Sequence, residues 1–555
     1  MRNILKISFI FIFITSFLMV QGSVYPFHNN NWQVLANAEE NDFIMGGDIS
    51  MLEEVEDLGG EFYEDGIKKD ALEILSSNGM NYVRLRLWVD PYDDQGNPYG
   101  GGTNDLDTTI NLAKRAKANG MEVLLDIHYS DFWADPGTQT KPKAWQNLNY
   151  SELKDQVYNY SRDVITTMKS EGVMPEMVQV GNEITSGVLW DDGRVGDGND
   201  NFVELAELLS VGIDGINDAL SPNENIEIVL HLDHGGDNDL YRWWFDAIIA
   251  EEVDFDIIGF SYYPFWHGTM GELQYNMNDV SKRYDKDVMI VETAYAFTLE
   301  DGDGLGNSFF KEEEKVGGYP ASPQGQMDFI RDLREIVEDV PNNRGRGIHW
   351  WEPTWLPVEG ANWGTEAGKL YNNDTGLLSN PWDNQTLFDF DGNALESLSQ
   401  FSKTTPVNLA SNHDFELDGW TDNPSDWGIW SEEPDDRDAV FVEEPGITGD
   451  YKLTHWKESD YTASTYQTIS GLEDGHYTFT AWVLSSGGQD DTYIYAKNYG
   501  GSEKQTEIPE SPDKWVKVEI EDIQVTNGKC EIGVISFANG GDWLNMDNVK
   551  FYKEY

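Results

Sequence analysis

From residue 42 to residue 404, short apolar runs alternate with longer amphipathic stretches. This alternation is typical of β-strands that are joined by helices and form a parallel sheet. The amphipathic stretches predict helices such as Asp105–Asn119, Leu153–Glu171 and Phe202–Ala219. Eight strands within about 360 residues predict an α/β fold, a (β/α)8 TIM barrel with enlarged loops. The apolar runs that predict these strands are Phe43–Gly46, Tyr82–Trp88, Glu122–Ile127, Met177–Val180, Glu227–Leu230, Ile257–Phe260, Val288–Val291 and Gly347–Trp350.

The pattern changes over residues 405–555, where apolar and polar positions alternate with a period of two. Segments such as Tyr477–Trp482, Trp515–Ile520 and Asn548–Tyr552 are separated by Gly, Asp and Pro turns. Short alternating strands with such turns are typical of an antiparallel sandwich. The sequence therefore predicts a second, all-β jelly-roll domain after the barrel.

The first residues are a basic start, Met1–Lys6, followed by the apolar run Ile7–Val20. This order predicts a secretory signal peptide over residues 1–22, followed by an N-terminal segment over residues 23–41. The cleavage point stays open, because Ala36-Asn-Ala38 also resembles a processing site. The alternative is an uncleaved membrane anchor, for which the run is short. We expect a secreted, extracellular protein with no membrane partner once processed.

The charge balance limits the partners of the chain. Its 37 basic and 100 acidic residues give a formal net charge of −63, which excludes nucleic acid and anionic membranes as ligands. A neutral polymer is compatible, although the acidity also suits salty or alkaline surroundings. The single cysteine, Cys530, excludes an intrachain disulfide. The 20 Trp and 26 Tyr suit stacking on sugar faces as well as core packing. We expect a monomer.

Two glutamates end predicted strands. Glu183 closes the segment that begins at Met177, and Glu292 closes the one that begins at Val288. In a TIM barrel the chemistry lies at the C-terminal ends of the strands. Cleavage of a glycosidic bond needs two carboxylates, one that protonates the leaving oxygen and one that attacks the anomeric carbon. Asn182, beside Glu183, is placed to bond a sugar hydroxyl. The alternative, two solvated strand ends, is less favoured for a pair than for one glutamate.

Other candidate sugar contacts follow or lie within predicted strands. The loop after the third strand carries His128, Trp133 and Asp135, although a loop whose polar groups bond to one another is the alternative. Arg84 and Arg86 share one face of the second strand, and either is a candidate to hold Glu292 ionised. The alternative for either arginine is a structural ion pair. The sequence does not show which of the two arginines has which role. The remaining candidates are Arg86 itself, Tyr263 as a partner of the nucleophile, and Trp351 and Trp355 as a stacking platform.

The segment Glu300–Asn307 spaces oxygen ligands between glycines, as calcium-binding loops do. Side chains would come from Asp301, Asp303 and Asn307, a carbonyl from Leu305, and remote help from Asp383. The alternative is an acidic, solvated turn. The sequence has no His/Cys cluster for zinc, no phosphate-binding glycine loop and no Ser-centred nucleophile elbow, and we expect no organic cofactor.

These segments together resemble family 53 of the glycoside hydrolases, the arabinogalactan endo-β-1,4-galactanases that act on the galactan side chains of pectin. The resemblance implies that Glu183 is the acid/base and Glu292 the nucleophile of a retaining reaction. It also implies a structural calcium ion at Asp301–Asn307, joined by a segment matching Asn380–Asp383. Two departures are Leu305, where histidine is common, and Asn380, where serine is expected. The motifs are Gly46–Ser50, Val83–Trp88, His128–Asp131, Trp133–Pro136, Gly181–Glu183, Val291–Tyr295, Trp351–Pro353 and Asp383–Gln385.

The C-terminal region resembles jelly-roll carbohydrate-binding modules, in particular the galactan-binding family 61. The segments Asn412–Glu416 and Met546–Phe551 carry this resemblance. Candidate tryptophans for stacking on a sugar are Trp427, Trp430, Trp456 and Trp543. Two rival functions stay open: a β-mannanase or cellulase on the same barrel, and a non-catalytic polysaccharide-binding protein.

Overall fold

The computed structural model describes residues 43–196, 198–372, 378–402, 408–447 and 449–553. The predicted signal peptide and N-terminal segment, as well as the predicted boundary between residues 404 and 405, lie outside these ranges. Within the described ranges, no helix is both long and apolar enough to cross a membrane.

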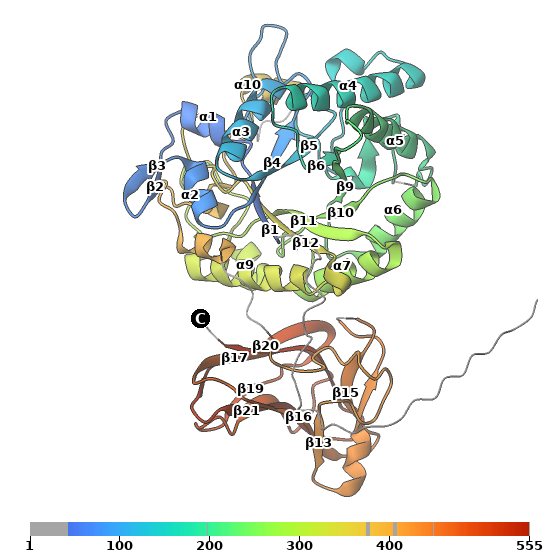
Figure 1. Ribbon diagram of the computed structural model, residues 1–555, viewed down its shortest axis with the longest axis vertical. Helices are drawn as coiled ribbons and strands as arrows, with labels where there is room; N and C mark the ends of the chain where they lie inside the picture. Colours follow the sequence, from blue (N-terminus) through green and yellow to red (C-terminus); the bar gives the residue numbers. More distant parts are fainter. Residues whose placement is uncertain (1–42, 197, 373–377, 403–407, 448, 554–555) are drawn as a thin grey trace, which may run out of the picture. The chain divides into compact units, whose positions relative to one another are not determined.

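Parallel strands close into a barrel in the order β1, β4, β5, β6, β9, β10, β11, β12 (Figure 1). The predicted TIM barrel is confirmed, and each predicted strand is present with ends shifted by at most a few residues. The bounds are β1 Ile44–Asp48, β4 Tyr82–Leu87, β5 Glu122–Ile127, β6 Met177–Val180, β9 Glu227–Leu232, β10 Ile257–Ser261, β11 Asp287–Thr293 and β12 Gly345–Trp351. Short hairpins are formed by β2 Phe62–Glu64 with β3 Ile67–Lys69, and by β7 Gly187–Val188 with β8 Gly193–Arg194.

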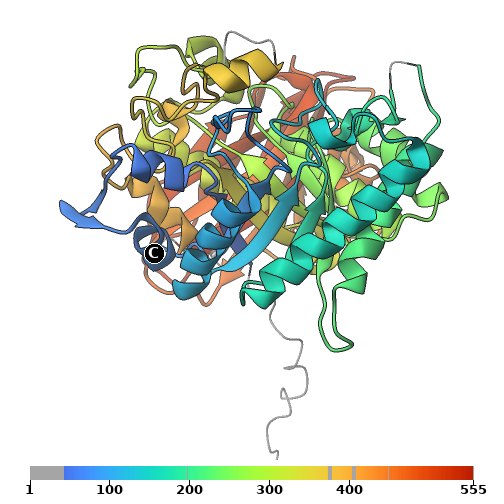
Figure 2. The same ribbon diagram turned by 90° about the horizontal axis from the view of Figure 1, so that it is seen from above.

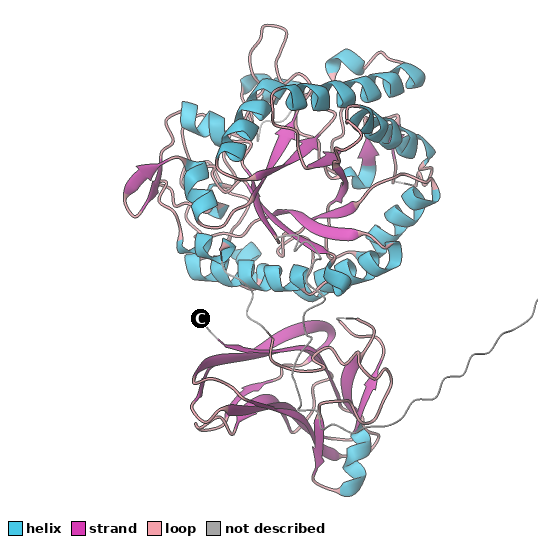
Figure 3. Ribbon diagram, in the orientation of Figure 1, coloured by secondary structure: helices cyan, strands magenta, loops and turns pink. Residues whose placement is uncertain are grey.

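Helices cover the outside of the barrel, as Figures 1 and 2 show and the colours of Figure 3 distinguish. Capping boxes fix the starts of two of them, Asn149 with Glu152 and Thr269 with Glu272. Their apolar sides pack on the strands, and the predicted helices are confirmed. The bounds are α1 Leu52–Asp57, α2 Ala71–Ser77, α3 Leu106–Ala118, α4 Tyr150–Ser170, α5 Val203–Asp218, α6 Asn238–Ala250, α7 Met270–Tyr284, α8 Lys311–Gly317, α9 Pro323–Glu338 and α10 Glu366–Asn372.

The barrel interior changes from apolar to charged along the strands. Its first layer is the cluster Ile44, Tyr82, Leu124, Met177, Val229, Ile257, Met289 and Val291. Side chains two positions further along a strand point to the same face, one layer higher. There the interior holds fully buried polar groups, including Arg84, Asp126, Gln179 and His231. Buried charges are costly unless they are paired, so this layer has to be an organised network.

The C-terminal domain consists of two antiparallel five-stranded sheets, which confirms the predicted antiparallel β domain. Their inner faces enclose a separate apolar core that includes the side chain of Cys530. One sheet runs β13 Gly428–Ser431, β16 Tyr461–Ser470, β21 Lys529–Ala538, β18 Asp491–Lys497, β19 Lys504–Glu507. The other runs β14 Val440–Glu443, β15 Lys452–Trp456, β22 Trp543–Lys553, β17 Gly475–Ser485, β20 Ser511–Val525.

Candidate active site

Glu183 lies just beyond β6 on a backbone turned into the left-handed region, with φ of 45°. Such a φ is unfavourable for a residue with a Cβ and is typical of functional sites. Ser261, at the end of β10, donates its hydroxyl to Oε1 of Glu183 at 2.6 Å. His231 supports both partners: its Nε2 bonds to Ser261 Oγ at 2.8 Å, and its Nδ1 accepts the backbone N–H of Glu183 at 3.4 Å. The turn and these contacts fix the position of this carboxyl group.

The surroundings of Glu183 favour its protonated form. Burial raises its pKa well above the ordinary value, and the charges of Glu292 and Asp233 raise it further. The hydrogen bond from Ser261 acts in the opposite direction. Burial and neighbouring negative charge both disfavour a carboxylate, so Glu183 holds its proton to higher pH than an exposed glutamate does.

Glu292 is delivered by β11, where the register between β10 and β11 shifts next to Ser261. Its Oε1 lies 2.8 Å from Nη2 of Arg84, and Tyr263 donates its hydroxyl to Oε2 at 3.4 Å. Burial raises the pKa of Glu292 to about 7, while the positive charge of Arg84 lowers it. Glu292 thus lies against a cation, whereas the side-chain partner of the Glu183 carboxyl group, Ser261, is neutral. These contacts favour Glu292 as the ionised member of the pair.

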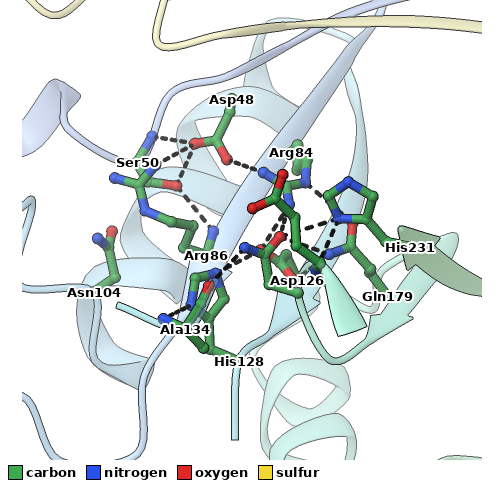
Figure 4. Close-up of polar contacts among 12 residues, drawn as sticks. Asp48, Ser50, Arg84, Arg86, Asn104, Asp126, His128, Ala134, Gln179 and His231 are labelled. Carbon is green, nitrogen blue, oxygen red and sulfur yellow. Dashed lines mark hydrogen bonds and ion pairs between the residues drawn. The ribbon is translucent and has the colours of Figure 1, made fainter. Parts of the chain in front are cut away.

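Arg84 is the centre of the charged layer, and Figure 4 shows its contacts. Besides Glu292, its guanidinium contacts Asp48 at 2.8 Å, Asp126 at 2.9 Å and Oδ1 of Asn182 at 2.8 Å. Coulombic attraction to these carboxylates raises the pKa of Arg84 above its usual value, although burial opposes this effect. Of the two arginines that the sequence left unresolved, Arg84 is the one that holds Glu292.

Arg86 has a different position from the predicted one. It is 1% exposed, pairs with Asp48 and Glu352, and lies 4.6 Å below the Trp133 ring. Its contacts are thus with other groups of the protein, and Arg86 as a substrate contact stays a prediction. The alternation along β4 shows which face a side chain takes but not how deep in the barrel it lies.

The predicted residues in and near the loop after β5 mainly bond to other groups of the protein. His128 is 1% exposed; its Nε2 bonds to Asp126 at 2.8 Å, and its Nδ1 accepts the indole N–H of Trp88 at 3.2 Å. These bonds occupy both ring nitrogens, and His128 as a sugar contact stays a prediction. Asn182 is 6% exposed and donates to the carbonyl of Ala134. Asp135, whose pKa burial raises, is partly exposed and contributes charge that raises the pKa of Glu183.

A wall of tryptophans packs next to Tyr263, which contacts Glu292, and its most exposed member is not a predicted residue. Trp363, in the loop after β12, is partly exposed and stacks on Trp133 with ring centroids 4.4 Å apart. Trp355 is fully buried and also stacks on Trp363, at 5.7 Å, so other rings of the protein cover the faces of Trp363. Trp351 packs between Trp363 and Trp382 and keeps 5% of its surface exposed. A stacking platform of Trp351 and Trp355 stays a prediction.

The acidic loop forms a cluster of oxygen ligands. Asp301, Asp303 and Asp383 bring carboxylate oxygens within 4.8 Å of one another. The buried Oδ1 atoms of Asp383 and Asn307 have no hydrogen-bond partner among the described residues. Burial raises the pKa of Asp383 to about 6. Hard oxygen ligands and unpartnered oxygens fit a calcium ion.

The two departures from the family pattern have different outcomes. Leu305 is 59% exposed and donates its N–H to Asp303, which leaves its carbonyl as the only group it can offer to an ion. Asn380 donates its backbone N–H to Asp303 at 3.0 Å. Its side chain bonds instead to the carbonyl of Trp355 and the N–H of Trp382. The side chain of Asn380 is thus engaged within the protein, and Asn380 as a metal ligand stays a prediction.

Several residues of the site were not found from the sequence. Asp126, His231 and Ser261 form the contacts that orient the two glutamates, and Trp363 joins the wall of tryptophans. His231 and Ser261 each lie one residue beyond the predicted strand end, where the apolar run stops. Their position at a strand C-terminus is the signal that marked the glutamates as well.

Comparison with known proteins gives consistent matches. The model of the family described as Glycosyl hydrolase family 53 matches residues 44–401. A Bacillus subtilis (strain 168) protein named endo-beta-1,4-galactanase is 39% identical over 385 residues, which is 65% of this chain and 85% of that protein. The solved Ignisphaera aggregans GH53 catalytic domain is 44% identical with a TM-score of 0.61, and the match covers 66% of this chain and 97% of that one. A solved structure of fungal beta-1,4-galactanases is 32% identical with a TM-score of 0.54, covering 65% and 100%.

Proposed function

Since the chain belongs to glycosyl hydrolase family 53 and is a glycoside hydrolase, we propose that it is a secreted, retaining endo-β-1,4-galactanase. Its substrate is the β-1,4-galactan of type I arabinogalactan in pectin. One observation carries the mechanism: of two glutamates at the C-terminal ends of β6 and β11, Glu292 is paired with Arg84, and the charge of Glu292 raises the pKa of Glu183. The names of the relatives support the choice of galactan over mannan or cellulose.

The reaction is a double displacement. An oxygen of Glu292 attacks the anomeric carbon while Glu183 transfers its proton to the glycosidic oxygen, and the bond between that carbon and the leaving oxygen breaks. Glu183, now ionised, takes a proton from water, and the water oxygen displaces Glu292 from the same carbon. Two inversions retain the β configuration. We propose that Trp351, which keeps 5% of its surface exposed, contacts the apolar face of a sugar during both steps.

The test is incubation of the purified protein with linear β-1,4-galactan, β-mannan and cellulose. We expect galacto-oligosaccharides from galactan only, and NMR within the first minutes should show the β anomer before mutarotation. Initial formation of the α anomer would contradict the retaining mechanism. Hydrolysis of mannan or cellulose in preference to galactan would instead support the rival function on the same barrel.

Replacement of Arg84 should shift the pH profile. Ionised Glu292 is the active form, its pKa is about 7, and the charge of Arg84 lowers that pKa. Removing the charge raises the pKa further, so the acid limb of kcat/KM moves to higher pH. Arg84→Met should show this shift, whereas Arg84→Lys, which keeps a charge but not the forked contacts, should show a smaller one. An acid limb that stays in place in folded Arg84→Met would contradict the role of Arg84.

The proposal includes a structural calcium ion held by Asp301, Asp303, Asn307 and Asp383. When bound, the ion cross-links the acidic loop to the segment at Asp383 and neutralises their charges. A ligand at 100 times its Kd stabilises the folded state by about 2.7 kcal/mol. A chelator should therefore lower the melting temperature by several degrees, and calcium should restore it.

The calcium prediction has a matched control. Asp383→Asn should lose most of the response to calcium, whereas Asp94→Asn, a change at an exposed loop position, should keep it. If neither chelator nor calcium changes the melting temperature of the unmodified protein, the prediction of a structural calcium ion is contradicted.

The proposal also assigns the C-terminal β domain as a carbohydrate-binding module. Its two five-stranded antiparallel sheets and its exposed tryptophans, Trp430 and Trp456, support this assignment. Such a module would keep the enzyme on insoluble polysaccharide by raising the local concentration of substrate.

A further inference from the structure

The loop that follows β9 carries two titratable side chains, Asp233 and His234, next to the turn that carries Glu183. Strands β6 and β9 are neighbours in the barrel, so the loops after them adjoin. Asp233 is 3% exposed, and both of its carboxylate oxygens are bonded: Oδ1 accepts the hydroxyl of Thr185, and Oδ2 bonds to Nδ1 of His234. Thr185 lies two residues beyond Glu183, in the turn Ile184–Ser186. The buried carboxylate is therefore fixed to the turn that follows Glu183.

His234 is held in place by a second histidine. Its backbone lies in the left-handed region, with φ of 56°, which is unfavourable for a residue with a Cβ. Its ring stacks on the ring of His267, with centroids 5.1 Å apart and 24° between the planes. Nδ1 of His267 lies 3.0 Å from the carbonyl oxygen of Ser261, the residue whose hydroxyl bonds to Glu183. The contacts thus form a closed ring that begins and ends at Glu183.

One member of the stacked histidine pair is suited to carry a charge near neutral pH. Burial and the charge of His234 lower the pKa of His267 to about 4, so the ring of His267 is neutral. The ring of His234 is exposed and lines a hollow of about 580 Å³. The bond to Asp233 raises the pKa of His234, and the charge of Asp237 adds to this, although partial burial opposes both. His234 can therefore exchange a proton with solvent in the pH range where histidines act as switches.

The other titratable groups around Glu183 hold a fixed charge in the active form of the site. Glu292 is ionised there, and Asp135 adds negative charge from the loop after β5. Three further groups are neutral because burial disfavours their charged forms, namely His231, Tyr241 and Tyr263. Asp233 is the third acidic neighbour of Glu183, and it is the one that is bonded to a histidine with a raised pKa. A change in the charge of His234 therefore reaches Glu183 through Asp233.

We propose that Asp233 is a positioning residue whose buried carboxylate keeps the proton on Glu183, and that His234 weakens this effect at low pH by neutralising the same carboxylate. The inference rests on the proposed role of Glu183 as the acid/base. When His234 is protonated, its positive charge offsets the charge of Asp233. As the pH rises through the pKa of His234, the imidazolium loses its proton and the charge of Asp233 acts in full on Glu183. Glu183 then holds its proton to higher pH, which places the alkaline limb of the pH profile at higher pH.

The experiment measures the pH profile of kcat/KM on β-1,4-galactan for variants of the full-length chain. Asp233→Asn removes the charge and keeps the shape. His234→Asn removes the histidine charge, tolerates the left-handed backbone and still offers an amide donor to Asp233. Asp239→Asn is the matched control, because Asp239 lines the same hollow but is exposed to solvent. The melting temperature checks the fold of each variant, and kcat/KM on an aryl galactobioside whose leaving group needs no proton checks the attack by Glu292.

We expect Asp233→Asn to move the alkaline limb to lower pH by about one unit, because a like charge near Glu183 is lost. His234→Asn should move the limb in the opposite direction, because Asp233 keeps its charge and has lost its cation. Asp239→Asn should leave the limb in place. The value of kcat/KM on the aryl substrate should change little in all three variants, since Glu183 gives no proton to that leaving group.

An alkaline limb that stays in place in folded Asp233→Asn would overturn the inference, as would a shift in the same direction in both variants. A limb that moves in Asp233→Asn but not in His234→Asn would contradict the role given to His234. If Asp233→Asn does not fold, the shift in His234→Asn decides, and its absence would overturn the inference.

Glu183→Ala separates this inference from the proposed function. An alkaline limb that persists in Glu183→Ala would contradict both, because another group would then supply the proton. Loss of the limb in Glu183→Ala, together with an unmoved limb in Asp233→Asn, would contradict only the role of Asp233 and leave the proposed function intact.

Discussion

Glu292→Gln is expected to lower kcat on β-1,4-galactan by at least about 10⁴-fold, because the amide cannot form the glycosyl ester. The side chain keeps its shape, and Tyr263 still lies near it, so the melting temperature should change little. Release of reducing sugar measures the effect. Glu359→Gln, a change at an exposed glutamate beyond β12, is the control and should keep full activity.

The role of Glu292 can be separated from simple damage to the site. In Glu292→Ala, azide should occupy the place of the carboxylate and attack an aryl galactobioside with a good leaving group. The product should be the α-galactosyl azide, because only one inversion takes place. More than about 1% of normal turnover in purified Glu292→Gln would contradict the assignment.

Glu183→Ala is expected to have an effect that depends on the leaving group. General acid catalysis contributes about 10²- to 10⁴-fold, so hydrolysis of galactan should fall by an amount in this range. An aryl galactobioside whose leaving group needs no proton should still form the ester with Glu292. Turnover of this aryl substrate should then be limited by the attack of water on the ester, because the variant lacks the carboxylate that deprotonates the water.

Azide distinguishes Glu183 from Glu292 as well. In Glu183→Ala it should attack the ester formed with Glu292 and give the β-galactosyl azide, the product of two inversions. The alkaline limb of the pH profile, which reports loss of the proton from Glu183, should also disappear. An equal loss of activity on both substrates, with the alkaline limb retained, would show that another group supplies the proton.

The sequence predicted the barrel because each of its strands is a short apolar run that ends in polar residues. The same ends marked Glu183 and Glu292, since a carboxylate that follows a buried strand is conspicuous against the run before it. The predicted antiparallel domain was identified in the same way, by a period of two instead of 3.6. Such patterns depend on neighbours in the sequence and can be read without coordinates.

The sequence did not show how deeply the candidate side chains are buried. Arg86, His128 and Trp355 lie on the strands or loops where they were predicted, yet each is almost completely buried. The covering groups come from elsewhere in the chain: Trp133 covers Arg86, and Trp363 covers Trp355. Periodicity gives the direction of a side chain, whereas its exposure depends on long loops that have no period.

The charged layer inside the barrel bears on attempts to make this enzyme more heat-resistant. Arg84, Arg86, Asp48, Asp126 and Glu352 occupy a volume that aliphatic side chains would fill in an ordinary core. Exchanging a complete buried ionic set for well-packed apolar residues is often neutral or favourable for folding, whereas removing one partner is costly. Variants selected only for survival on heating would accumulate such exchanges here and lose turnover, because Glu292 depends on that charge. Thermal engineering is better directed at the outer helices and at the loops that precede the strands, far from the carboxyl ends of the strands.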